Sequence, residues 1–126
     1  MNEDFVPFDL AKKLKEKGFN CEYPFAMYNK YEQFCPLYSS DKDCFGIDDF
    51  DKHACIAPTI SQVLKWLREE KNLSVEVLIS MRGGWYNIIY EIAPRRGFDL
   101  KHMLIEEKSY EDAAIAGIEY VIDNLI

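Results

Sequence analysis

The sequence predicts an α+β fold, with an antiparallel sheet of three to five strands and about three helices packed mainly on one face. Residues 8–17, 59–71 and 109–126 place apolar side chains at the three- and four-residue intervals of amphipathic helices. Between the last two, residues 74–92 contain two stretches of alternating apolar residues, which is typical of strands. Because the helical and strand patterns are grouped along the chain, α+β is favoured over an alternating α/β fold.

The first helix is expected from about Phe8 to Lys17. Pro7 suits the first turn of a helix, because its fixed φ matches the helical value. Gly18 can take the left-handed conformation that ends many helices, and Phe19 should then fold back onto Leu14. The lysines of this helix are interpreted as a solvated face near its C-terminus.

The segment after this helix is the least regular part of the sequence. Residues 24–29 are expected to form a short strand, whereas residues 30–56 show no sustained period and combine aromatic with acidic residues. Since disordered linkers contain few aromatic residues, we expect the segment to be ordered and to pack on the rest of the domain.

The second helix has a clear start and end. Thr59 and Gln62 form a capping box after Pro58, and Asn72 can stop the helix. Its buried stripe is expected to consist of Ile60, Val63, Leu64 and Leu67, flanked by Trp66.

A β-hairpin and a third strand are predicted next. Ser74 to Met81 should form one strand and Trp85 to Ile92 the other, joined by a turn at Arg82-Gly83-Gly84. Phe98 to Ile105 is the expected third antiparallel strand. The predicted apolar faces are Val75, Val77, Ile79 and Met81; then Tyr86, Ile88, Tyr90 and Ile92; then Phe98, Leu100, His102 and Leu104.

The closing helix begins at Ser109, which can cap it together with Asp112. Its apolar face is expected to comprise Ala114, Ile118, Val121, Ile122 and Leu125. Gly117 costs about 1 kcal/mol relative to alanine in mid-helix, so it predicts close approach of another element.

Length and charge set the broad class. The 126 residues fit a single α+β domain over residues 1–126. The net charge of −7 argues against non-specific binding of phosphate groups. No apolar run reaches the ~18–20 residues that cross a bilayer, and the acidic start, residues 1–4, does not resemble a secretory signal. The expected location is therefore the cytoplasm.

Metal and cofactor motifs are incomplete. The acidic run that begins at Asp41 matches an EF-hand loop at Asp43 and Gly46, but Phe45 and Lys52 replace two of its ligands. An acidic surface loop is expected instead, and no metal and no cofactor are predicted. The turn at residues 82–84 lacks the lysine of a phosphate-binding loop, so a hairpin turn explains its glycines.

The cysteines are Cys21, Cys35, Cys44 and Cys55, and without a signal peptide they are expected to be reduced. His53 and Cys55 are the one close pair of soft ligands, which is not the paired spacing of a zinc site. A nucleophilic Cys55 would need His53 or His102 as its base. Its apolar neighbours would raise the thiol pKa, so a packed structural cysteine is favoured and no catalytic residue is predicted.

A helix followed by a hairpin, as predicted here for the second helix, is also found in winged-helix DNA-binding proteins. A recognition helix presents basic or amide side chains, and here Glu69 and Glu70 lie beside Lys65 and Arg68 in an acidic chain. Direct nucleic-acid binding is therefore not expected.

The chain resembles a family of short uncharacterised proteins that are frequent in prophages and mobile elements of gut anaerobic bacteria. Three segments carry the resemblance: residues 8–19, residues 57–70 and residues 110–118. The segment from about residue 30 to 56 is longer than is usual in that family. The resemblance implies a small intracellular α+β domain and implies no activity.

The favoured function is a non-enzymatic, cytoplasmic protein-interaction module with a protein partner of unknown identity. A phage or mobile-element origin is a further hypothesis. Aromatic residues are enriched at interfaces, and the possible interaction surface comprises Tyr28, Tyr31, Phe34, Tyr38, Phe45 and Phe50. One alternative is an acidic inhibitor or nucleic-acid mimic, which would use Asp41, Asp43, Asp48, Asp49 and Asp51. The other is a cysteine-dependent enzyme or a metal-binding protein.

Overall fold

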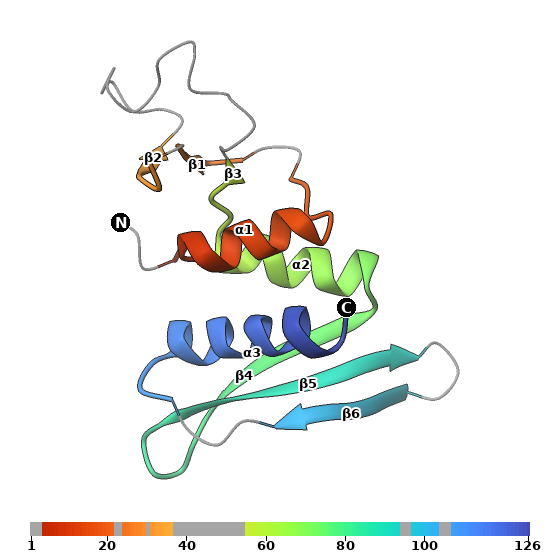
Figure 1. The fold of residues 1–126 in the computed structure, drawn as a ribbon. Coiled ribbons are helices and arrows are strands. Elements are labelled where there is room, and N and C mark those ends of the chain that lie inside the picture. Colours follow the sequence, from red (N-terminus) through yellow and green to blue (C-terminus); the bar gives the residue numbers. More distant parts are fainter. Residues whose placement is uncertain (1–3, 22–23, 30, 37–54, 94–96, 104–106) are drawn as a thin grey trace. The chain divides into compact units, whose positions relative to one another are not determined.

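A computed structural model describes residues 4–21, 24–29, 31–36, 55–93, 97–103 and 107–126. Within these ranges the chain forms three helices and six strands (Figure 1), which confirms the predicted α+β class. The strands form two antiparallel sheets of three, with orders β2-β1-β3 and β4-β5-β6.

The two sheets belong to different compact units. The N-terminal unit is Met1–Thr59 and the C-terminal unit is Ile60–Ile126. Each unit is described by itself, and the single domain over residues 1–126 stays a prediction.

Helix α1 of the N-terminal unit spans Phe8–Glu16. It ends as predicted. Gly18 has a φ of +88°, its N–H donates to the Lys15 carbonyl at 3.1 Å, and the Phe19 N–H donates to the Leu14 carbonyl at 2.9 Å. These two bonds define a Schellman motif, which folds Phe19 back into a buried position.

The sheet of this unit consists of β1 (Ala26–Tyr28), β2 (Phe34–Pro36) and β3 (Cys55–Ile56). Strand β1 confirms the strand predicted at residues 24–29, and it pairs antiparallel with both neighbours. The Tyr28 hydroxyl donates to the Val6 carbonyl at 2.6 Å. The chain before α1 is thereby tied to the sheet.

The turn between β1 and β2 is built around Asn29. Its Oδ1 accepts the N–H groups of Tyr31 at 2.8 Å and Gln33 at 3.0 Å. Its Nδ2 donates to Oε1 of Gln33 at 2.9 Å, and Glu32 takes a positive φ of 66°. An asparagine that bonds its own following backbone is a common way to stabilise a turn, and this one holds Tyr31 in the turn.

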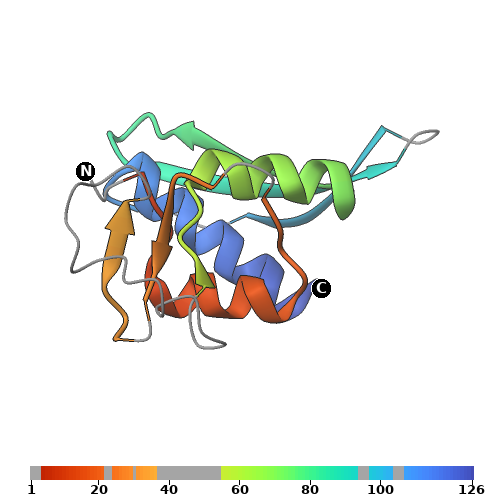
Figure 2. The same cartoon turned by 90° about the horizontal axis from the view of Figure 1, so that it is seen from above.

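The C-terminal unit consists of α2 (Ile60–Glu70), β4 (Leu73–Ile79), β5 (Trp85–Ala93), β6 (Gly97–Met103) and α3 (Tyr110–Asn124). Figures 1 and 2 show both helices on the same face of the sheet, and α2 and α3 also pack against each other.

Helix α2 agrees with its prediction. Ile60, Val63, Leu64 and Leu67 are buried. Asn72 follows the helix with a φ of +54°, the left-handed conformation expected of a stop residue.

Helix α3 is capped by Ser109, whose Oγ accepts the N–H of Asp112 at 3.1 Å. Four of the five predicted core residues are buried: Ala114, Ile118, Val121 and Ile122. The predicted close approach at Gly117 is also present, because a Cβ placed there would lie 2.7 Å from Cγ1 of Val75 in β4.

The register of the hairpin decides which residues face the helices. Val75 pairs with Ile89 and Ile79 pairs with Trp85. Since side chains alternate along a strand, odd-numbered residues of β4 and β5 share the helix-covered face. The two apolar faces predicted from the sequence therefore lie on opposite sides of the sheet.

Strand β6 confirms the predicted third antiparallel strand. Its pairing with β5 shifts between Ile89 and Tyr90, so His102 pairs with Ile89 whereas Leu100 pairs with Tyr90. This shift breaks the regular alternation that the sequence predicted for the strand.

Candidate interaction surface

The C-terminal sheet has apolar residues on both faces. On the helix-covered face of β5, Asn87 and Ile89 are completely buried. On the opposite face, the half-buried residues are Tyr86, Ile88, Tyr90 and Ile92. Antiparallel sheets covered on one side usually carry polar residues on the other, so this second apolar face is unusual.

Leu78 of β4 extends this face, because it pairs directly with Tyr86 and is 39% exposed. Among the described elements of the unit, both helices lie on the opposite side of the sheet (Figure 1). We call these five residues the outer-face patch: Leu78, Tyr86, Ile88, Tyr90 and Ile92.

The end of the hairpin is also apolar and exposed. Ile79 is 63% exposed, and Met81 in the loop is fully exposed. The loop is held by the Ser80 N–H, which donates to the Gly84 carbonyl at 2.6 Å. Gly83 takes a φ of +92°, which confirms the predicted turn.

Strand β4 forms one edge of its sheet. The Ile92 N–H donates to the Asn72 carbonyl at 2.7 Å, and Ser80 bonds Gly84 across the hairpin. Backbone polar groups alternate in direction along an antiparallel strand. The backbone N–H and C=O groups of the even-numbered residues of β4 therefore point toward β5. Those of Val77 and Ile79 point away from β5, at the edge of the sheet.

The residues predicted as an interaction surface fall into four groups. Tyr28 is 8% exposed and packs edge-to-face on Phe8 and Phe34, so it serves the interior of the N-terminal unit. Phe34 is half-buried, with Phe5 on its other side. Tyr31 is 69% exposed. Tyr38, Phe45 and Phe50 lie outside the described residues.

The N-terminal unit contains one described pocket of about 280 Å³, with Lys15 and Asn20 at an otherwise apolar lining of Ala11, Phe19, Met27, Cys55 and Ile56. Burial raises the pKa of the Cys55 thiol, and the nearby Lys15 and Lys12 only partly oppose this. A thiol whose pKa is raised is a poor nucleophile at neutral pH. His53 lies outside the described residues, and of His102 only the backbone pairing is described.

Most residues of the predicted metal and acidic motifs lie outside the described residues. In the described part of the chain, Cys21, Cys35 and Cys55 form no disulfide bond. The described residues contain no group of three potential metal ligands. Cys44, Asp41, Asp43, Asp48, Asp49 and Asp51 fall in the undescribed segment.

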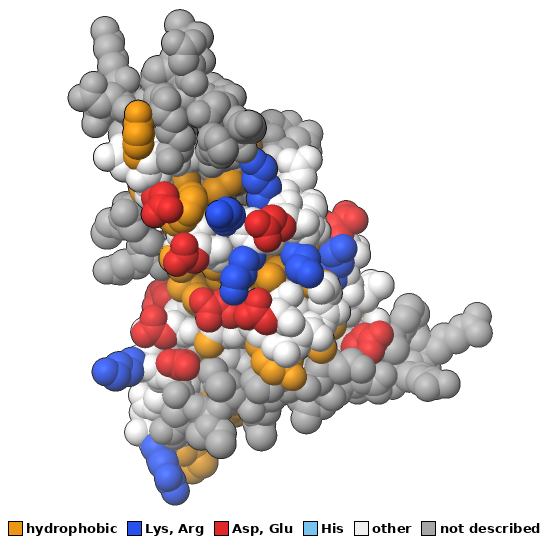
Figure 3. Space-filling view, in the orientation of Figure 1, with side chains coloured by type: hydrophobic (Ala, Val, Ile, Leu, Met, Phe, Trp, Pro, Cys, Tyr) orange, Lys and Arg blue, Asp and Glu red, His pale blue; other side chains and the backbone are white. Residues whose placement is uncertain are grey.

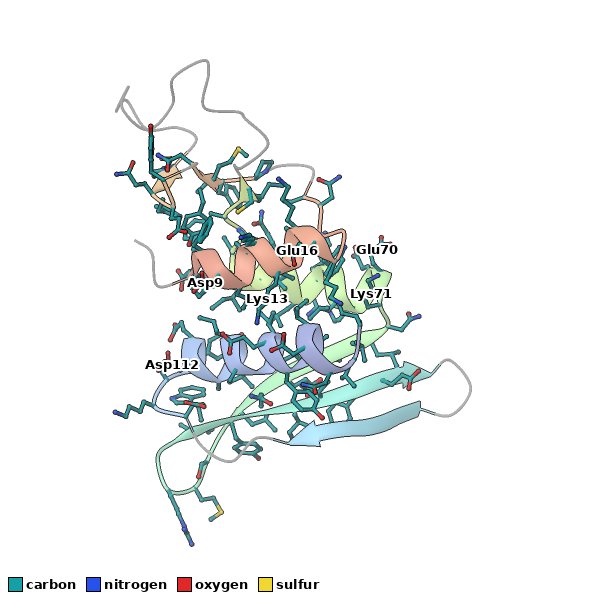
Figure 4. All side chains as sticks on the ribbon, in the orientation of Figure 1. Asp9, Lys13, Glu16, Glu70, Lys71 and Asp112 are labelled. Atoms are coloured by element: carbon teal, nitrogen blue, oxygen red, sulfur yellow. The ribbon has the colours of Figure 1, made fainter. Side chains whose placement is uncertain are left out.

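Described charges of both signs are mixed on the visible surface (Figure 3). Along α1, Asp9, Lys13 and Glu16 follow one another at helical spacing (Figure 4). Glu70, Lys71 and Asp112 lie at helix ends in the other unit. The face shown in Figure 3 therefore presents no field of a single sign that would favour a nucleic-acid mimic.

The sequence did not indicate two features of the C-terminal sheet. The exposed edge of β4 depends on which strands pair. Asn87 lies within the apolar run from Trp85 to Tyr90, and its Nδ2 donates to the Ala113 carbonyl of α3 at 2.9 Å. The continuous run could have indicated that both faces of the strand are apolar, because strands buried on both faces often lack alternation.

No family model, curated protein or solved structure matches this chain. In the described part of the chain, no helix is both long and apolar enough to cross a membrane. The geometry alone therefore carries the functional argument.

Proposed function

We propose that the protein is a small non-enzymatic protein-interaction module, and that the outer-face patch is its contact surface. The observation that carries the proposal is the two-sided apolar character of β5. Its inner face is already covered by α3, with Ile89 completely buried. The apolar side chains of its outer face contribute little to that core.

The chemistry of the patch suits a protein partner. It combines two tyrosines with three aliphatic residues, and interface cores are enriched in tyrosine and poor in charge. Covering such side chains contributes about 25 cal/mol for each Å² of apolar surface removed from water. Binding a protein would therefore stabilise the complex without any catalytic group.

The setting of this function is part of the same proposal. A cytoplasmic protein encoded by a prophage or mobile element agrees with the resemblance that residues 8–19, 57–70 and 110–118 carry. Tyr31 is a second candidate contact, since it is exposed in a turn that Asn29 holds in place.

The test is affinity capture from the native host with wild-type protein and Ile88→Lys as baits. Ile88 pairs with Glu76 across the strands, so a lysine can form a cross-strand ion pair and folding should be retained. We expect partners enriched on the wild-type bait to fall at least tenfold with Ile88→Lys.

The control bait is Lys65→Glu, on the exposed side of α2, which should keep the partners. Urea unfolding of each bait verifies that it is folded. Partners that bind Ile88→Lys and wild type equally would contradict the proposal.

A further inference from the structure

We propose that β4 binds an extended segment of a partner protein along the edge that pairs with no strand among the described residues. The segment adds as an antiparallel strand and places a lysine or arginine opposite Glu76, with apolar residues on either side. This inference rests on the proposed function and specifies the form and chemistry of the partner.

The edge is built to accept a strand. Its outward N–H and C=O groups at Val77 and Ile79 have the spacing of an antiparallel ladder, as derived from the bonds of Asn72 and Ser80. The pairing of β4 with β5 runs from Leu73 to Ile79 without a register shift. Edge strands are usually protected by a bulge, a proline or charged side chains. Strand β4 has no bulge and no proline, and Glu76 is its one charged residue.

The opposite edge of the sheet differs in this respect. The pairing of strand β6 shifts between Ile89 and Tyr90 of β5. A bulge is a common means of preventing strand addition. The contrast points to β4 as the edge that pairs.

The exposed half of β4 defines what the added strand carries. Leu73, Ser74 and Val75 are buried, whereas Glu76, Leu78 and Ile79 are exposed. Glu76 is the one charged residue of this strand. A side chain directly opposite it in an added strand would lie about 4.5–5.5 Å away between Cβ atoms. A cation there is favourable, and an apolar residue suits Leu78 and Ile79.

Charge also favours a basic segment over a second copy of the chain as the partner of β4. Two copies paired over the full length of β4 would place Glu76 opposite its own equivalent, and like charges directly opposite are destabilising. Each copy also carries a net charge of −7. The acidic edge is therefore complementary to a basic segment and repels itself.

The proline variant Val77→Pro tests the backbone contact. Because the Val77 N–H points out of the sheet, proline removes the outward donor without removing a bond to β5. Glu76→Lys tests the charge contact. Urea unfolding of both variants must show the cooperative transition of the wild type, and Ile79→Pro replaces Val77→Pro if that variant fails to fold.

The probes are two seven-residue peptides of alternating valine and threonine, one with lysine and one with glutamate at the centre. Binding is followed by NMR shifts of the β4 amides. We expect the lysine peptide to shift Val77 and Ile79 and to bind about fivefold more tightly than the glutamate peptide. Glu76→Lys should reverse this preference, and Val77→Pro should abolish binding.

Methylation of peptide nitrogens provides a matched control. Methylating the nitrogens that face β4 should abolish binding, and methylating the alternate nitrogens should leave it unchanged. Shifts confined to Tyr86–Ile92, equal binding of both peptides, or concentration-dependent self-association through β4 would each overturn the inference.

The capture experiment separates the two proposals. Partners lost with Ile88→Lys but retained by Val77→Pro would overturn strand addition and leave the interaction module intact. Partners retained by both variants would overturn both.

Discussion

Gly117 and Asn87 determine how closely α3 approaches the sheet. A Cβ at Gly117 would lie 2.7 Å from Cγ1 of Val75 and 3.3 Å from Cγ of Asn87. Asn87 is completely buried and bonds the Ala113 carbonyl, whereas its Oδ1 has no hydrogen-bond partner in the described part of the chain. Close packing is thus achieved at the cost of one unsatisfied acceptor.

Gly117→Ala should destabilise the protein even though alanine is the better helix former. Overpacking typically costs about 1–3 kcal/mol, against a helix-propensity gain of about 1 kcal/mol. Urea unfolding should show a net loss. In a Val75→Ala background, which removes the obstructing methyl group, the loss should shrink or become a gain. An equal loss in both backgrounds would mean that Val75 is not the obstacle.

The structural roles of Gly117 and Asn87 differ in how far the sequence could predict them. A glycine in the middle of a strongly patterned helix predicts a close contact from propensity alone. A buried asparagine within an apolar run gives no such signal. Its role depends on a backbone carbonyl that lies 26 positions away in the chain.

At the scale of elements, local sequence signals predicted where helices and turns end, but they did not predict how the strands pair. The ends of α1, α2 and the hairpin turn were correctly placed because each is fixed by residues within one turn of the chain. The register of β4 on β5 depends on the whole connection Ser80–Gly84, and a change of one residue would exchange the two faces. The shared face of Tyr86, Ile88, Tyr90 and Ile92 was predicted from the sequence. Its position opposite the helices and beside Leu78 could be assigned only in three dimensions.

The pairing of β1 with β3 predicts a loss of stability at alkaline pH. Tyr28 lies opposite Cys55, and burial raises the pKa of both groups above their ordinary values of 10.0 and 9.0. A raised pKa means that the folded protein holds these protons more tightly than the unfolded chain. These two groups should therefore leave the free energy of unfolding unchanged well below pH 9.0 and lower it as the pH rises through 9.0 and 10.0.

Tyr28→Phe should flatten the upper part of this decline, at the cost of the bond to Val6, a loss of about 1 kcal/mol at pH 7. Tyr31→Phe is the matched control, because that side chain is 69% exposed and should leave the decline unchanged. Urea titrations from pH 7 to 11 provide the measurement. A decline of the same slope in wild type and Tyr28→Phe would exclude Tyr28 as its source.

At the scale of the whole molecule, each unit has its own sheet and its own buried residues. The grouping of helical and strand patterns predicted the α+β class correctly, since it depends on the order of elements alone. The division of the strands into two sheets was not predicted, because residues 30–56 carry no period from which pairing could be read.

A fragment of residues 60–126 should fold without the N-terminal unit. Its two helices and three strands contain residues that are buried in the full chain: Val63, Leu67, Ile89, Ile118 and Val121. Domains of about 60 residues are marginally stable, so we expect a cooperative urea transition at lower midpoint than that of the full chain. Leu67→Ser in the fragment should abolish it. An unfolded fragment would instead support the single domain predicted for residues 1–126.

The free edge of β4 has a consequence for how the protein behaves in solution at high concentration. An unprotected strand edge with exposed Leu78 and Ile79 is a template for uncontrolled association as well as for a specific partner. Mutual repulsion between molecules of net charge −7 opposes that association. The negative charge thus protects the protein from aggregation. This protection weakens when salt screens the charge or when acid neutralises the carboxylates.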